Sequence, residues 1–219
     1  MIKTIISDLG NIIVFFNNDL FFQRIKKYSP FSVDDMKIMA DQYIPLLQAF
    51  DTGRISPKDF YRKVTGILKA GIDQDTFFPI YTDIFSINTS ALKTLISLKP
   101  RYRLIMLSNT DVERFSFIKK AFPEIRIFDE YVLSYEQGIM KPHPSIFLKA
   151  LELSEAEAVE CVFIDDIEEN ILAASELGIK TIHFLPDTNL EAELHKLGVI
   201  LPDSLKISLP EKNIKNILT

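Results

Sequence analysis

The chain has 219 residues, of which 47% are apolar and 25% charged, and its formal net charge at pH 7 is −5. This composition can build a sizeable core and excludes a disordered chain. The Lys and Arg residues are scattered, which argues against a nucleic-acid partner. The apolar stretches are too short to span a membrane, and the start "MIKTIISDLG" has no signal-peptide pattern. We therefore expect a cytoplasmic protein, either a monomer or a weak dimer.

The first predicted element is a short buried strand over residues 2–7, which are mostly β-branched or aliphatic. From about residue 19 to 87 the pattern is helical and rich in Phe and Tyr. Ser32 and Ser56 stand where they can cap helices, and Gly71 is expected to end the helix that begins after Ser56. After this region the chain alternates, with strands predicted at 103–107, 131–134, 161–164 and 180–184 and helices at 111–122, 145–153 and 168–177.

The alternation predicts βαβ units and hence an α/β fold, a Rossmann-like core of three layers in which helices cover both faces of a parallel sheet. The helical region directly after the first strand interrupts this alternation, so it indicates an inserted helical cap. We expect the core to comprise residues 1–15 and 88–197, the cap residues 16–87, and an irregular C-terminal tail residues 198–219.

Polar side chains follow three of the predicted strands. Asp8 ends the first strand, Ser108 and Asn109 follow the second, and Asp165 and Asp166 follow the strand at 161–164. Each residue alone would be an ordinary turn or cap residue. Because ligands of open parallel sheets bind outside the carboxyl ends of the strands, this order predicts one shared site.

A basic residue, Lys141, joins these polar groups from the loop "EQGIMKPHP". Three carboxylates crowded at one point raise each other's pKa unless a cation lies between them, and one lysine compensates only in part. Oxygen ligands with room for water suit Mg²⁺, which typically binds one or two carboxylates together with a substrate phosphate. The sequence therefore predicts a Mg²⁺ cofactor.

The segments "SDLGNIIV", "MLSNT", "EQGIMKP" and "FIDDIEENILAASELG" resemble, in this order, the four motifs of the haloacid dehalogenase (HAD) superfamily. The helical insertion resembles the type C1 cap of that superfamily. The local sequence of these four segments is similar to that of the branch that contains alpha-D-glucose-1-phosphate phosphatase. The resemblance covers roughly residues 1–197.

The resemblance implies that Asp8 is a nucleophile that takes up the phosphoryl group as an aspartyl-phosphate. Such a carboxylate phosphate can be split by water, so one difficult transfer becomes two easier ones. Ser108 and the backbone amide of Asn109 would bind phosphoryl oxygens. Lys141 would bind the transferring group and offset its charge and that of Asp8.

The resemblance also implies a metal site made by Asp8, the backbone carbonyl of Gly10 and Asp166. Asp165 would complete the catalytic set by ordering the water molecules on the metal and pairing with Lys141.

One position departs from the family pattern. Most phosphatases of this superfamily carry a second aspartate two residues after the nucleophile, and this chain has Gly10 there. That aspartate is a general acid and base, a role that contributes about 10²–10⁴-fold. Asn11 tolerates left-handed backbone geometry. If Gly10 has a positive φ, replacing it would strain the loop. His143 is a candidate for the missing acid, whereas His183 is expected at the surface.

The leading hypothesis is a Mg²⁺-dependent phosphatase of a small phosphorylated metabolite such as a sugar phosphate, acting through an aspartyl-phosphate. A phosphate-binding or interaction protein with little turnover is the alternative, and Gly10 is its support. A 2-haloacid dehalogenase would also lack the second aspartate. The pair Asp165 and Asp166 argues against it, because a metal-free site gains nothing from two extra carboxylates beside an anionic substrate.

Overall fold

The computed structural model describes residues 1–202, and its centre is a five-stranded sheet with the order β5-β4-β1-β6-β7. Every neighbouring pair in this sheet is parallel. The strands are β1 (Thr4–Ser7), β4 (Arg103–Ser108), β5 (Glu130–Leu133), β6 (Cys161–Asp165) and β7 (Lys180–His183). The predicted α/β class with its parallel sheet is confirmed.

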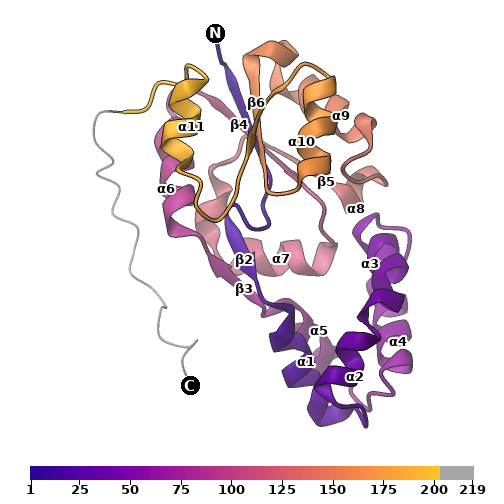
Figure 1. Ribbon diagram of the computed structural model, residues 1–219. Coiled ribbons are helices and arrows are strands. Elements are labelled where there is room, and N and C mark those ends of the chain that lie inside the picture. The colour runs from indigo at the N-terminus through magenta and orange to yellow at the C-terminus, as the bar shows by residue number, and fades with distance from the viewer. Residues whose placement is uncertain (203–219) are drawn as a thin grey trace.

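Helices cover both faces of the sheet, which gives the three predicted layers (Figure 1). The helices on one face are α6 (Thr89–Leu98), α7 (Val112–Ala121) and α11 (Leu190–Lys196), and those on the other are α9 (Pro144–Ser154) and α10 (Glu168–Glu176). Alternate strand residues separate the two cores: Ile5 packs on the first face and Ile6 on the second. Helices α6 and α11 were not predicted, although Leu92 and Leu95 stand at helical spacing.

Five further helices form a lobe beyond the carboxyl edge of the sheet (Figure 1). They are α1 (Asn18–Ile25), α2 (Val33–Ile38), α3 (Ile44–Asp51), α4 (Pro57–Ile67) and α5 (Gln74–Thr82). This helical insertion has its own aromatic core, in which the rings of Phe50 and Phe60 stack 4.2 Å apart. Ser32 and Ser56 cap α2 and α4 through their hydroxyl groups, as predicted.

Short elements complete the chain. They are α8 (Ser134–Gln137) and the 3₁₀ helices η1 (Lys26–Tyr28), η2 (Ala40–Tyr43), η3 (Pro123–Ile127) and η4 (Ala158–Glu160). No helix within residues 1–202 has the length and apolar character needed to cross a membrane.

Two details of the predicted helical region are wrong. Residues Phe85–Ile87 form a strand, β3, which pairs antiparallel with β2 (Val14–Phe16), so a two-stranded ribbon connects the sheet to the helical insertion. Each of these two strands has only three residues, and about 70 positions separate them. Strands this short show no recognisable hydrophobic periodicity in the sequence. In addition, α4 ends at Ile67 and turns through Lys69 (φ 47°), so Gly71 does not end the helix.

Most of the predicted C-terminal tail, residues 203–219, lies outside the described residues. Residues 199–202 have no regular structure, as predicted, but they are attached to the core. Val199 is buried and the backbone N–H of Ile200 donates to the Tyr102 hydroxyl at 2.7 Å.

Candidate active site

The carboxyl ends of β1 and β6 bring a lysine between two carboxylates. The Lys141 Nζ lies 2.9 Å from Asp8 Oδ1 and 2.7 Å from Asp165 Oδ2. The side chain of Lys141 is 1% exposed and that of Asp165 is fully buried, whereas Asp8 keeps a small exposed surface. The parallel sheet thus places three of the predicted residues in one chain of ion pairs.

Lys141 is held in place through its backbone by Asn109. The Asn109 amide donates to the Lys141 carbonyl at 2.9 Å, and the Lys141 N–H donates to Asn109 Oδ1 at 2.8 Å. This side chain therefore ties the loop of Lys141 to the end of β4. The sequence had suggested only the backbone amide of Asn109, because a contact between two loops leaves no local pattern.

Two groups predicted to bind phosphate, the Ser108 hydroxyl and the N–H of Asn109, lie at the end of β4. Ser108 is buried at the end of β4, and its hydroxyl makes no hydrogen bond within residues 1–202. The N–H of Thr110 donates to Ser134 Oγ at 2.9 Å, whereas the N–H of Asn109 has no partner within that range. The Ser108 hydroxyl and the N–H of Asn109 can thus each donate a hydrogen bond to an anion.

Burial and neighbouring charges shift the pKa values of Asp8 and Lys141. Burial raises the pKa of Asp8 to about 6, Lys141 opposes this rise and Asp165 adds to it. For Lys141 burial lowers the pKa, but Asp8 and Asp165 outweigh it, so the net pKa is raised. Asp8 is therefore mostly a carboxylate at neutral pH and Lys141 an ammonium.

Asp8, Asp165 and Asp166 can each offer an oxygen within 4.8 Å of the others. The Asp165 oxygens are already occupied, because they accept from Lys141 Nζ, from the N–H of Ile167 at 2.8 Å and from Asn170 Nδ2 at 3.0 Å. Asp8 and Asp166 each keep one oxygen without a protein partner among the described residues.

The free carboxylate oxygens of Asp8 and Asp166 are oxygen donors, whereas the carbonyl of Gly10, the third predicted ligand, accepts from the N–H of Ile12 at 2.7 Å. Hard oxygen donors with an excess of negative charge suit a hard divalent cation. The residues present therefore fit a magnesium ion.

The loop after Asp8 corrects one expectation. Asn11 is left-handed (φ 54°), as predicted, but Gly10 is not among the residues with positive φ. A Cβ at Gly10 would meet Phe16 Cε1 at 3.6 Å, which is an ordinary van der Waals contact. Gly10 therefore does not exclude a side chain by strain or by crowding.

The two histidines lie differently from one another. His143 is exposed, and its Nδ1 accepts from the N–H of Ser145 at 3.2 Å and so caps α9. His183 is partly buried at the end of β7, and its Nε2 lies 3.0 Å from the Asp166 carbonyl oxygen. The expectation that His183 is a surface residue is wrong, since parallel pairing with β6 places it beside Asp165 and Asp166.

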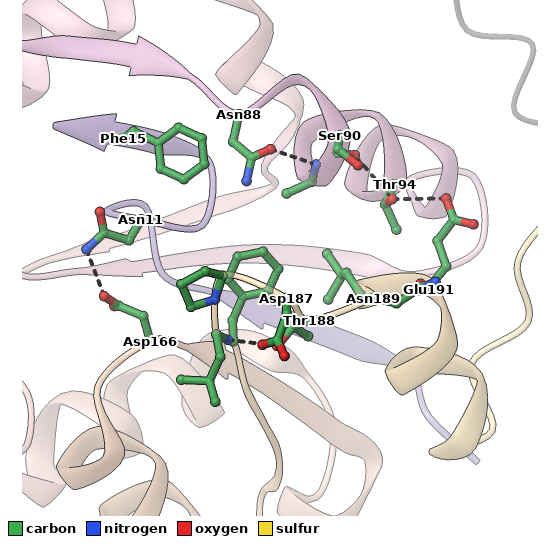
Figure 2. A pocket seen from close by; sticks show the side chains of 15 residues that line it. Asn11, Phe15, Asn88, Ser90, Thr94, Asp166, Asp187, Thr188, Asn189 and Glu191 are labelled. Carbon is green, nitrogen blue, oxygen red and sulfur yellow. Dashed lines mark hydrogen bonds between the residues drawn. The ribbon is translucent and has the colours of Figure 1, made fainter.

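Two cavities flank the carboxylates. One of about 860 Å³ begins at Asn11 and Asp166 and extends along residues 184–191 (Figure 2). The other, of about 690 Å³, lies between Lys141 and His143 on the core and Arg54 on the helical insertion. The first cavity adjoins the cluster at Asp166 and the second at Lys141, and the lining of neither includes Asp8 or Ser108.

A second buried polar group joins the helical insertion to the core. The Tyr81 hydroxyl donates to Asp111 Oδ2 at 2.7 Å, and the Arg114 guanidinium lies 4.4 Å above the Tyr81 ring. The hydroxyl of Ser134 donates to the Asp51 carbonyl at 2.5 Å. Asp51 Oδ1 and Arg114 Nε are buried without a hydrogen-bond partner among residues 1–202. Sequence reasoning missed this interface cluster (Asp51, Tyr81, Asp111, Arg114), because its members come from separate segments.

The fold and this edge of the sheet define an α/β enzyme. The chain matches the haloacid dehalogenase-like hydrolase family over residues 3–178 and belongs to that family. It is 26% identical over 210 residues to a D-ribitol-5-phosphate phosphatase from Bacteroides thetaiotaomicron, covering 92% of this chain and 99% of that protein. A shorter match, 36% identical over 98 residues, links it to a glyceraldehyde 3-phosphate phosphatase from Pyrococcus abyssi, covering 43% and 40% of the two chains.

Solved structures agree with this assignment. A HAD family enzyme from Bacteroides thetaiotaomicron, crystallised with magnesium and inorganic phosphate, is 25% identical with a TM-score of 0.78, covering 88% of this chain and 99% of that one. An L-2-haloacid dehalogenase is 18% identical with a TM-score of 0.64, covering 87% and 90%, and this likeness concerns the fold alone.

Proposed function

We propose that this protein is a magnesium-dependent phosphatase that hydrolyses a small phosphorylated metabolite, such as a sugar or polyol phosphate, through an aspartyl-phosphate on Asp8. The observation that carries the proposal is Lys141, buried between Asp8 and Asp165 beside a third carboxylate. A lone nucleophile would need neither the lysine nor Asp166. The phosphatases among the relatives support the same reaction class.

In this proposal Asp8 attacks phosphorus while the ester oxygen leaves, and water then attacks the aspartyl-phosphate and releases inorganic phosphate. Ser108 and the N–H of Asn109 hold phosphoryl oxygens, and Lys141 balances the charge of Asp8 and the transferring group. Asp8, the Gly10 carbonyl and Asp166 would hold the magnesium ion, which supplies positive charge to the phosphoryl oxygens. Asp165 keeps Lys141 in place through their 2.7 Å ion pair.

The proposal also gives the helical insertion a role as a cap. The helical insertion faces the site through Arg54 and Thr52 in the smaller cavity. We assign it the role of a cap that contacts the leaving group. The ion-pair chain gives no reason to expect binding without turnover.

Gly10 is the observation that favours the second candidate, a phosphate-binding or interaction protein with little turnover. Its missing carboxylate removes the usual proton donor, but phosphoryl transfer depends mainly on positioning and charge stabilisation. The metal-free dehalogenase hypothesis explains neither Asp166 nor its open oxygen.

A panel of phosphorylated sugars, polyols and trioses, assayed with Mg²⁺ and with chelator, tests the proposal. We expect at least one of these metabolites to be hydrolysed, and we expect its hydrolysis to require Mg²⁺. Binding of inorganic phosphate without turnover of any ester would favour the second candidate. Full activity in chelator, or release of halide from 2-chloropropionate, would contradict the proposal.

A further inference from the structure

Asn11 connects the loop after β1 to the Asp166 side chain. Its N–H donates to the Val14 carbonyl at 2.7 Å, so the loop holds its backbone in place. Its side-chain Nδ2 donates to Asp166 Oδ2 at 2.8 Å (Figure 2). The left-handed φ of 54° suits Asn, Asp or Gly, and of these three only Asn carries an N–H donor in its side chain.

The neighbouring carboxylates Asp165 and Asp166 are restrained very differently. Asp165 accepts from a lysine, a backbone N–H and an amide, which together use both of its oxygens. The Asp166 carboxylate accepts only from Asn11 among residues 1–202, and its Oδ1 stays open. Within the described part of the chain, the hydrogen bond from Asn11 is thus the one that fixes the orientation of the Asp166 carboxylate.

The surroundings of Asp166 make this single donor important. Asn11 and Asp166 stand at one end of the larger cavity, whose lining includes Asp187 and Glu191 and no Lys or Arg. A lysine at this place would neutralise Asp166, whereas an amide orients the carboxylate and leaves its full negative charge for a cation. A free Asp166 side chain could rotate into the cavity and away from Asp8.

We propose that Asn11 is a positioning residue that holds Asp166 in the orientation needed to bind the metal ion. Groups that orient metal ligands in this way typically change metal affinity by about 10–100-fold when they are removed. The inference rests on the metal site of the proposed function and is independent of which ester the enzyme hydrolyses.

Isothermal titration of Mg²⁺ into substrate-free protein tests the inference. Asn11→Gly keeps the left-handed backbone and removes the amide, and we expect its Kd for Mg²⁺ to rise about 10–100-fold. The matched control is Asn189→Gly. Asn189 lines the same cavity and caps α11, but it makes no bond with Asp166, so the affinity should stay at the wild-type value.

The wild-type titration separates the two levels of the argument. If the wild type does not bind Mg²⁺, the metal dependence of the proposed function fails and the inference fails with it. If the wild type and Asn11→Gly bind equally, only the role of Asn11 is overturned. A crystal structure of the wild type with Mg²⁺ is the second measurement, in case Asn11→Gly does not fold. Asn11 Nδ2 should remain within hydrogen-bond distance of Asp166, and a separated pair would overturn the inference.

Discussion

Residues 1–202 contain two largely buried groups of carboxylates with one cation each, and the two groups are built differently. In the cluster that we propose to be catalytic (Asp8, Lys141, Asp165, Asp166; the catalytic cluster below), the lysine makes contacts of 2.9 and 2.7 Å with two carboxylates. In the interface cluster Arg114 Nε lies 3.7 Å from Asp111 Oδ2, and Asp51 Oδ1 has no hydrogen-bond partner within the described part of the chain.

The difference follows from where the residues come from. The catalytic cluster stands on strand ends and loops of one sheet, so parallel pairing fixes its geometry before anything binds. The interface cluster combines Asp51 and Tyr81 of the helical insertion with Asp111 and Arg114 of the core, so its contacts depend on how these two parts meet. We therefore expect the first cluster to control chemistry and the second to control stability.

The largest expected effect comes from Asp8→Asn. Removing the nucleophile should lower kcat/KM by about 10⁴-fold or more, while Lys141 keeps its ion pair with Asp165. Steady-state assays with circular dichroism and a melting curve check both parts. Asp111→Asn is the control, since it should lower the melting temperature and keep most of the activity. An active, pure Asp8→Asn variant would remove the covalent mechanism.

Replacing each cation by methionine compares the clusters directly. Removing one partner of a buried ion pair costs about 3–5 kcal/mol, so Lys141→Met should melt at a clearly lower temperature. Arg114→Met should lose less stability, because the Arg114 side chain is 22% exposed and its Nε lies 3.7 Å from Asp111 Oδ2. Only Lys141→Met should also lose hydrolysis, because Arg114 does not contact Asp8 or Ser108. Melting curves and kcat/KM below both transitions provide the measurement. Equal loss of activity in folded Arg114→Met would show that the clusters are not separate in function.

The two adjacent aspartates should divide their effects. Asp166→Ala should weaken Mg²⁺ binding more than Asp165→Ala, because Asp166 has the open oxygen. Asp165→Ala should lower the melting temperature more, because it leaves Asn170 and the Ile167 N–H without their acceptor and Lys141 with Asp8 alone. Calorimetric titration and thermal melting of both variants measure this division. The opposite ranking in both experiments would exchange the two roles.

Gly10→Asp tests whether the catalytic cluster lacks a proton donor. An alkoxide leaving group needs a proton as the bond breaks, whereas p-nitrophenolate needs little, so the ratio of kcat/KM for alkyl over aryl phosphate should rise about tenfold or more. An added Cβ at this position meets Phe16 Cε1 at an ordinary van der Waals distance of 3.6 Å, so the backbone accepts a side chain. The ratio is informative because kcat/KM reports the steps up to formation of the aspartyl-phosphate, in which the leaving group departs. An unchanged ratio in a variant that folds and binds Mg²⁺ normally would place the proton source elsewhere.

The smallest expected effect concerns pH and Asp51. Burial raises the pKa of Asp51 from its ordinary value of 3.8 to about 7, Arg114 opposes this rise and Asp111 adds to it. The folded chain therefore keeps a proton on Asp51 at pH values where the unfolded chain has lost it, and stability falls as pH rises from about 4 to about 7.

Asp51→Asn should remove this dependence. Wild type and variant should melt alike at low pH, and at pH 8 the variant should melt at the higher temperature. Melting curves across this range give the difference. A constant difference between the two proteins at every pH would show that Asp51 does not titrate in this window.

The sequence predicted the parts of the molecule that repeat a local rule. Strand residues such as Val162 and Phe163 are apolar without interruption, and Asp8 and Asp165 follow their strands directly, so both sheet and site could be anticipated. The β2–β3 ribbon could not, because its register depends on partners far apart in the chain.

The same limit applied to the contacts between loops and between the core and the helical insertion. Asn109 hydrogen-bonds to the backbone of Lys141, Asn11 to Asp166 and Tyr81 to Asp111. The two residues of each pair are at least 30 positions apart in the sequence. Such pairs are decided by tertiary packing, and the sequence shows only that each residue is polar.

Trapping the covalent intermediate tests the central claim most directly. A substrate labelled with ³²P on its phosphoryl group is mixed with the enzyme and Mg²⁺, quenched with acid during the first turnover, and the protein is digested. We expect the label on the peptide that contains Asp8, its release by hydroxylamine as for an acyl phosphate, and its absence from Asp8→Asn. Burst turnover without any labelled protein, or a label on another residue, would contradict the account.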